Sequence, residues 1–212
     1  MAQALIEFPQ LKRGLVAILR GLRPDEAVAI ADAIYSAGIE AIEVPLNSPD
    51  PFISIERIRA ALPESVLVGA GTVLTAGDVD ALASAGGRLM VSPNLDASVM
   101  ERAVAHGMVT MPGVFTPTEA FGALKLGASA LKFFPANILG TTGISAIRTV
   151  LPPGTKIAAV GGVSETDFAA YRTAGASLFG LGSSLFKPGT TVEEIARRSR
   201  SIVAAWDALA DS

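Results

Sequence analysis

The stretch "KIAAVGGVSETDFAAYRTAGASLFGLGSS", residues 156–184, contains one complete strand–helix–strand unit. A short apolar run at 156–160 stops at two glycines, and a second run at 178–182 also ends in glycine. Between them, residues 164–176 have the spacing of an amphipathic helix, with a serine at the start and a glycine near the end. Two strands joined by a helix predict a parallel sheet covered by helices.

The same unit repeats along the chain. Six more strands are predicted, at 15–19, 41–44, 66–69, 88–91, 108–111 and 130–134, so strand starts recur about every 20 to 30 residues. Helices are predicted between them, at 23–38, 75–87, 96–107, 116–128 and, after the last strand, from 191 to 206. Eight even units predict a single-domain TIM (β/α)8 barrel over residues 1–212, with a short N-terminal helix at about 2–11. A doubly wound open sheet is the alternative, but no G-x-G-x-x-G follows the first strand.

Composition limits the classes of function. Half of the residues are hydrophobic, and 17 Lys+Arg against 20 Asp+Glu give a net charge of -3 without a basic stripe, so we expect no nucleic-acid partner. The absence of cysteine excludes disulfides, thiolate metal sites and a cysteine nucleophile. We expect no signal peptide and no membrane span, and therefore a cytoplasmic protein. The single histidine, His106, falls late in a predicted helix and no histidine–carboxylate cluster exists, so no metal site is expected.

Unusual residues fall where the predicted strands end, which is where a TIM barrel carries its chemistry. Arg20, Glu43 and Lys132 are charged residues at the ends of the first, second and sixth strands. The last two strands end in glycines, which let the backbone approach an anion closely, and a serine hydroxyl adds a donor. Each glycine pair alone could be only a tight turn. Together on adjacent strands they favour a phosphate site, made of Gly161, Gly162, Gly182 and Ser183.

Lys132 interrupts an apolar strand in "ALKFFPAN", residues 130–137. One interpretation is a lysine that reaches out to solvent at the strand end. The other is a buried amine whose lowered pKa makes it nucleophilic, so that it forms a Schiff base with a carbonyl substrate. Glu43 is then either its salt-bridge partner or a general acid/base, since inward residues of the second and sixth strands share a layer. The pair indicates carbonyl chemistry without a metal.

Seven motifs, in order, resemble the class I aldolases that act on 2-keto-3-deoxy-6-phospho sugar acids. They extend from about residue 15 to 188: "VAILRG", "IEVPLNSP", "VGAGTVL", "SPN", "ALKFFPA", "AVGGV" and "GLGS". The resemblance implies a TIM barrel, usually trimeric and without a cofactor. Such enzymes cleave a phosphorylated six-carbon 2-keto acid into pyruvate and glyceraldehyde 3-phosphate.

The resemblance also implies a role for each matching residue. Lys132 would form the Schiff base and Glu43 would be the general acid/base. Arg20 and Thr72 would hold the pyruvate carboxylate region and polar groups of the substrate, and Pro93 would line that pocket. The phosphate would lie against Gly161, Gly162, Gly182 and Ser183.

Two branches of this family differ in the configuration of substrate carbon 4. In the gluconate branch we expect "EVTLRT" and "PTGG", whereas this chain has "EVPLNS" and "AVGG". Pro45, Asn47 and Val160 therefore resemble the galactonate branch, with Val160 in place of a threonine that could bind a substrate hydroxyl. The gluconate epimer as substrate, or activity on both epimers, is the alternative.

Two other classes of function remain as alternatives. A phosphate-binding synthase or epimerase, such as thiamine-phosphate synthase or a phosphopentose epimerase, would need metal ligands at the strand ends, and the sequence does not have them there. A non-catalytic barrel that binds a sugar phosphate would not need Lys132 and Glu43 together. The presence of both favours the aldolase.

Overall fold

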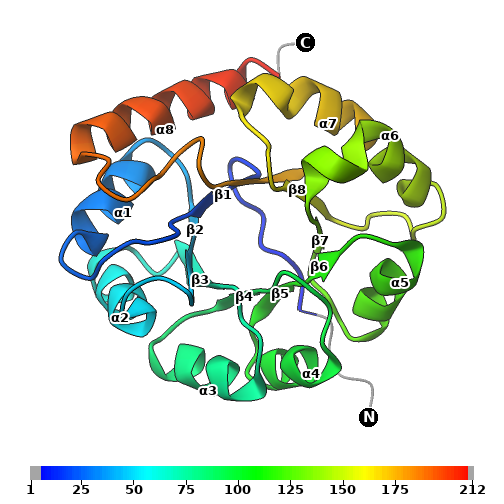
Figure 1. The fold of residues 1–212 in the computed structure, drawn as a ribbon, viewed down its shortest axis with the longest axis horizontal. Coiled ribbons are helices and arrows are strands. Elements are labelled where there is room, and N and C mark those ends of the chain that lie inside the picture. The colour runs from blue at the N-terminus through cyan, green and yellow to red at the C-terminus, as the bar shows by residue number, and fades with distance from the viewer. Residues whose placement is uncertain (1–5, 210–212) are drawn as a thin grey trace.

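Short apolar strands alternate with amphipathic helices through residues 6–209, the part of the chain that the computed structural model describes. The strands are β1 (Leu15–Ile18), β2 (Ala41–Pro45), β3 (Leu67–Gly71), β4 (Leu89–Val91), β5 (Val109–Met111), β6 (Gly113–Val114), β7 (Leu131–Phe133), β8 (Ile157–Val160) and β9 (Leu178–Leu181). All their pairings are parallel, in the order β5-β4-β3-β2-β1-β9-β8-β7-β6. Figure 1 shows the strands at the centre of a ring of helices. The predicted TIM-barrel class is confirmed.

The predicted strand at 108–111 continues past a proline into an additional short strand. Pro112 has no N–H to donate, so the ladder is interrupted there. Before the break, β5 pairs with β4, and after it β6 pairs with β7. The Pro112 carbonyl accepts a hydrogen bond from the amide of Lys132 at 3.0 Å. One bent segment therefore closes the barrel between β4 and β7.

The helices are α1 (Ala27–Ser36), α2 (Pro51–Ala61), α3 (Ala76–Ser84), α4 (Ala97–Ala105), α5 (Pro117–Lys125), α6 (Ala136–Arg148), α7 (Phe168–Ala174) and α8 (Val192–Asp207), with a 3-10 turn, η1 (Glu165–Asp167), before α7. Thr75 and Thr116, the first residues of the predicted ranges 75–87 and 116–128, start α3 and α5 with complete capping boxes. Within residues 6–209, no helix is both long enough and apolar enough to cross a membrane.

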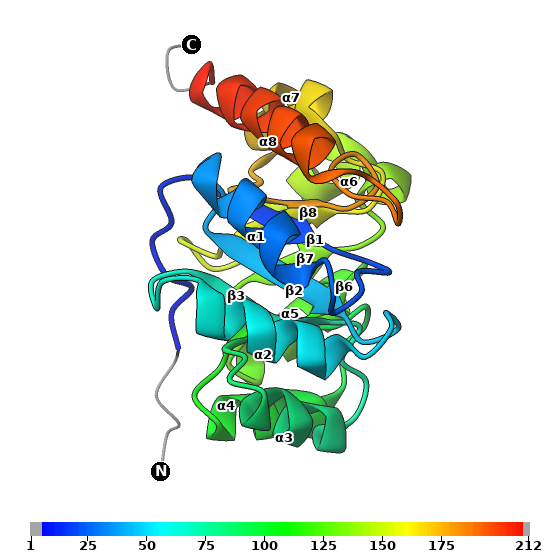
Figure 2. The same ribbon diagram turned by 90° about the vertical axis from the view of Figure 1, so that its left-hand side faces the viewer.

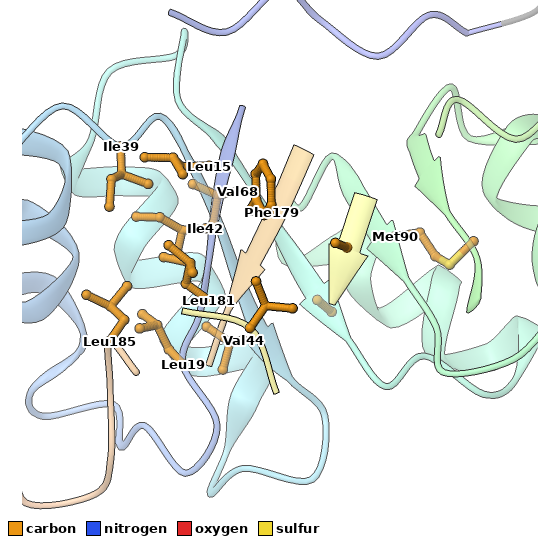
Figure 3. Packing of buried hydrophobic residues seen from close by; sticks show 14 of the residues in the cluster. Leu15, Leu19, Ile39, Ile42, Val44, Val68, Met90, Phe179, Leu181 and Leu185 are labelled. Atoms are coloured by element: carbon orange, nitrogen blue, oxygen red, sulfur yellow. The ribbon is translucent and has the colours of Figure 1, made fainter. Parts of the chain in front are cut away.

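Side chains of each strand alternate between two cores. Outward residues such as Leu15, Ile42 and Phe179 pack against the helices, as Figure 3 shows. Inward residues such as Val16, Ala41 and Leu89 fill the barrel. This period of two decides which side chains face the interior at the strand ends.

The N-terminal segment closes the end of the barrel at which the strands begin. Of the predicted N-terminal helix at about 2–11, residues 2–5 lie outside the described residues, and the prediction is wrong for 6–11, which contain no helix. Pro9 disfavours a helical conformation at the residue before it. An extended chain instead lets Ile6 and Phe8, two residues apart, pack on the inner core. Figure 2 shows this segment on the far side of the barrel from the loops that follow β1, β2 and β9.

Candidate active site

A cavity of about 350 Å³ opens at the C-terminal ends of the strands. Its size is that of a small-molecule site. All ten residues predicted from the sequence line it: Arg20, Glu43, Thr72, Pro93, Lys132, Val160, Gly161, Gly162, Gly182 and Ser183. The structure thus brings the predicted residues together, while their individual roles stay predictions.

Lys132 faces the barrel interior from β7, where it pairs with Gly113 on one side and Ala158 on the other. Its side chain is only 6% exposed, so the ammonium does not reach out to solvent. Its Nζ lies 4.8 Å from the centre of the Phe134 ring. Burial lowers the pKa of Lys132; nearby Glu43 opposes this effect, and the positive charge of Arg20 adds to it. This environment favours a neutral, nucleophilic amine.

Glu43 faces the same interior from β2 and is 2% exposed. Burial raises its pKa to about 7, although Lys132 and Arg20 both act to lower it. Its Oε2 has no hydrogen-bond partner, and within residues 6–209 no salt bridge joins Glu43 to Lys132. A carboxyl group with a pKa near neutrality and a free oxygen is suited to proton transfer rather than to a structural ion pair.

The loops after β1 and β2 hold Arg20 at the mouth of the cavity. Its Nη1 donates a hydrogen bond of 2.6 Å to Oδ1 of Asn47. The next residue, Gly21, donates its N–H to the hydroxyl of Ser48 at 2.9 Å. The guanidinium is therefore fixed beside the buried pair, where it can receive a carboxylate.

Thr72 has a left-handed backbone, with φ of +57°, which is strained for a β-branched residue. Its neighbour Val73 fixes the turn by donating its amide to the carbonyl of Val91 at 3.1 Å. Strain of this kind is concentrated at functional sites. Pro93, at the end of the next strand, completes this wall of the cavity.

The turn after β8 requires two glycines. Gly161 and Gly162 have φ of +95° and +68°. A Cβ at residue 162 would lie 2.5 Å from Cγ of Asn137, and a Cβ at residue 161 would lie 3.1 Å from the Phe134 ring. Gly182 and Ser183 face the same cavity from the end of β9. Backbone N–H groups that no side chain covers suit an anion such as phosphate.

Several cavity residues were missed by the sequence interpretation, which considered strand ends only. Phe134 lies two residues after Lys132 and so faces the same side of the strand, which was a usable signal. Lys187 and Pro188 lie further along the loop after β9, and no local pattern marks them. Conversely, the strand-end residues Asn94 and Pro112 do not line the cavity. Among the residues described, no cluster of three or more histidines or acidic residues could hold a metal.

Known proteins resemble this chain over nearly its whole length. The family model of KDPG and KHG aldolases matches residues 9–198. A "Probable 2-dehydro-3-deoxy-6-phosphogalactonate aldolase" of Rhizobium meliloti (strain 1021) is 56% identical over 204 residues, 96% of each chain. The 2-dehydro-3-deoxy-6-phosphogalactonate aldolase of Escherichia coli (strain K12) is 46% identical over 197 residues, 93% of this chain and 96% of that one. A solved structure described as "Native KDPGal structure" superposes with a TM-score of 0.94 and 44% identity, and covers 97% of this chain and 100% of that one.

Proposed function

Because the chain belongs to the KDPG and KHG aldolase family, we propose that it is a class I aldolase cleaving 2-dehydro-3-deoxy-6-phosphogalactonate to pyruvate and D-glyceraldehyde 3-phosphate. The observation that carries the proposal is a buried lysine, Lys132, in one cavity with a buried carboxyl group, Glu43. The similarity to two relatives that are named as 2-dehydro-3-deoxy-6-phosphogalactonate aldolases supports the galactonate branch over the gluconate branch, as Pro45, Asn47 and Val160 predicted.

The reaction begins with the neutral amine of Lys132. Its lone pair attacks carbon 2 of the keto acid to form a carbinolamine, and loss of water leaves an iminium ion. Burial makes the neutral amine available near neutral pH, because it disfavours the charged form. The positive nitrogen then accepts electrons from the bond that breaks.

Glu43 moves the proton in the second stage. Through a water molecule, its carboxylate takes the proton from the hydroxyl on carbon 4, the bond between carbons 3 and 4 breaks, and its electrons form an enamine. Glyceraldehyde 3-phosphate leaves, and the same carboxyl group returns a proton to carbon 3. Water then hydrolyses the iminium ion of pyruvate and frees Lys132. A pKa of about 7 allows Glu43 to act as base and then as acid.

The remaining cavity residues hold the two charged ends of the substrate. Arg20 and Thr72 receive the carboxylate region and polar groups, with Pro93 beside them. The phosphate binds at the glycine turns after β8 and β9, where Ser183 adds a hydroxyl. Binding both ends fixes carbon 2 next to the lysine.

We also propose a homotrimer in the cytoplasm. Exposed apolar side chains, including Leu74, Phe121 and Ile138 at 50%, 45% and 70% exposure, offer surface for contact between subunits. Light scattering of the purified protein at several concentrations tests this state. A mass of one subunit throughout would contradict it.

Cleavage of the two carbon-4 epimers, measured side by side as pyruvate release, tests the substrate. We expect preference for the galactonate epimer and no pyruvate from either epimer with Lys132→Ala. Preference for the gluconate epimer would contradict the assignment to the galactonate branch. Pyruvate from neither epimer would contradict the aldolase itself and favour a barrel that only binds sugar phosphates.

A further inference from the structure

The cavity wall contains a second lysine, Lys187, which the proposed reaction does not use. It lies in the loop between β9 and α8, a few residues after Gly182, and its side chain is exposed. The side chains of Leu185 and Phe186 before it are buried. Their amides both donate to the carbonyl oxygen of Gly182 at 2.9 Å. The start of the loop is therefore fixed to the phosphate-facing turn.

The other side of Lys187 is fixed as well. The hydroxyl of Thr190 donates to the carbonyl oxygen of Lys187 at 2.7 Å. The ring of Pro188 packs over Gly21, where a Cβ would lie only 2.7 Å from Cγ of the proline. The backbone of Lys187 is thus held against the loop after β1, and the flexible side chain is the part that can follow a ligand.

The charges in the cavity leave Lys187 without an assigned partner. Three lining residues are basic, Arg20, Lys132 and Lys187, and burial disfavours the charged form of Lys132. Glu43 is the one acidic residue among the described residues of the lining. Arg20 is hydrogen-bonded to Asn47 at the carboxylate end. Within residues 6–209, no carboxylate forms a salt bridge with Lys187.

Two basic residues of α8 already have a partner. Arg197 and Arg198, on the helix that follows this loop, both bind Glu194, at 2.8 and 2.7 Å. Lys187 has no such partner among the described residues, and an unpaired cation facing a cavity is suited to an anionic ligand.

We propose that Lys187 pairs with the substrate phosphate and makes the enzyme select phosphorylated over unphosphorylated sugar acids. The inference rests on the proposed function. A phosphate monoester carries a charge of about −1.5 to −2 at neutral pH. The glycine turns and Ser183 offer the phosphate only backbone dipoles and a hydroxyl group, and none of these carries a full positive charge. Lys187 supplies such a charge in the same cavity. An ammonium on a flexible stem acts as a point charge and needs no fixed geometry.

Lys187→Met tests the proposal, because it keeps most of the side-chain stem and removes the charge. With the phosphorylated substrate, kcat/KM should fall about 10- to 100-fold, mainly through KM. With 2-dehydro-3-deoxygalactonate, which lacks the phosphate, kcat/KM should not change. Lys187→Arg should retain most of the activity, and Lys125→Met, on the outer surface of α5, is the matched control. Equal losses on both substrates, or no loss on either, would overturn the proposal.

A binding measurement separates this inference from the proposed function. Glycerol 3-phosphate carries the phosphate end of the substrate but no reactive carbonyl, and calorimetry measures its affinity without catalysis. We expect weaker binding to Lys187→Met than to the wild type and to Lys125→Met. If the wild type cleaves neither epimer but this difference is found, the proposed function fails and the phosphate role stands. Equal affinity in all three proteins overturns the role of Lys187 even if the aldolase activity is confirmed.

Discussion

The carboxyl group of Glu43 occupies the space in which any residue larger than glycine at position 71 would place its side chain. A Cβ built on Gly71 would lie 1.9 Å from Oε2 of Glu43 and 2.5 Å from Oε1. The contact joins the end of β3 to the end of β2, and both residues face the barrel interior. The glycine is therefore part of what positions the carboxyl group.

Gly71→Ala should displace that carboxyl group while leaving Lys132 in place. We expect kcat to fall about 100-fold, since a shift of about 1 Å at a catalytic group has costs of this size. Schiff-base formation with pyruvate should persist, which borohydride reduction would detect. Gly77→Ala is the control, because a Cβ there meets only ordinary contacts in an exposed helix. A Gly71→Ala enzyme with the wild-type kcat would show that Glu43 is not positioned this way.

Glu43→Gln should change how stability depends on pH. In the folded protein the pKa of Glu43 is about 7, and in the unfolded chain it is about 4.3. The contribution of Glu43 to the stability of the folded protein is therefore complete below pH about 4.3, and it is lost as the pH rises through about 7. Glutamine does not ionise and has no such loss. The free energy of unfolding of the variant, relative to that of the wild type, should therefore rise by about 2 kcal/mol or more between pH 5 and pH 8. Urea unfolding at both pH values measures this difference, and a constant difference would contradict the raised pKa.

Asn47→Ala should release Arg20 from the mouth of the cavity. The variant loses the hydrogen bond of 2.6 Å to the guanidinium, so we expect KM to rise about tenfold with a smaller change in kcat. Asn47→Asp keeps the geometry but offsets the positive charge, and it should also raise KM. An unchanged KM in both variants would mean that Arg20 does not bind the carboxylate from this position.

Val160→Thr should alter the preference between the epimers. Val160 is 3% exposed and lines the cavity, and threonine has nearly the same shape with an added hydroxyl. We expect the ratio of kcat/KM values to shift toward the gluconate epimer by about tenfold or more. Rates for both epimers, measured with the same preparation, test this. An unchanged ratio would indicate that residue 160 does not determine the preference for one configuration at carbon 4.

Local residue patterns were sufficient for eight of the nine described strands, because each of these is a short apolar run between turn residues. The exception is β6, which follows the break at Pro112 and was not predicted. The same logic placed Glu43 and Lys132 inside the barrel, two residues after Ala41 and Ala130 on the inward face. Helix α1 begins at Ala27, four residues into its predicted range.

The helices at 51–61 and 136–148 were not located, for reasons visible in their residues. The first follows Asp50, whose left-handed backbone is not evident from its residue type, although Pro51 is a favourable first residue of a helix. The second contains Gly140 in a non-helical conformation. The extended N-terminal segment and the position of Lys187 depend on contacts between distant parts of the chain, through Phe8 and Pro188. Sequence spacing alone carries no information on such contacts.

The role of Lys132 as the nucleophile is tested most directly by borohydride reduction of the protein in the presence of pyruvate, followed by peptide mass spectrometry. Reduction of the iminium ion would fix the three-carbon acid irreversibly on the lysine nitrogen. We expect a single modified residue, Lys132, and none in Lys132→Met, which should still fold because methionine suits the buried position. No adduct, or an adduct confined to another lysine such as Lys187, would contradict the assignment of Lys132 as the nucleophile.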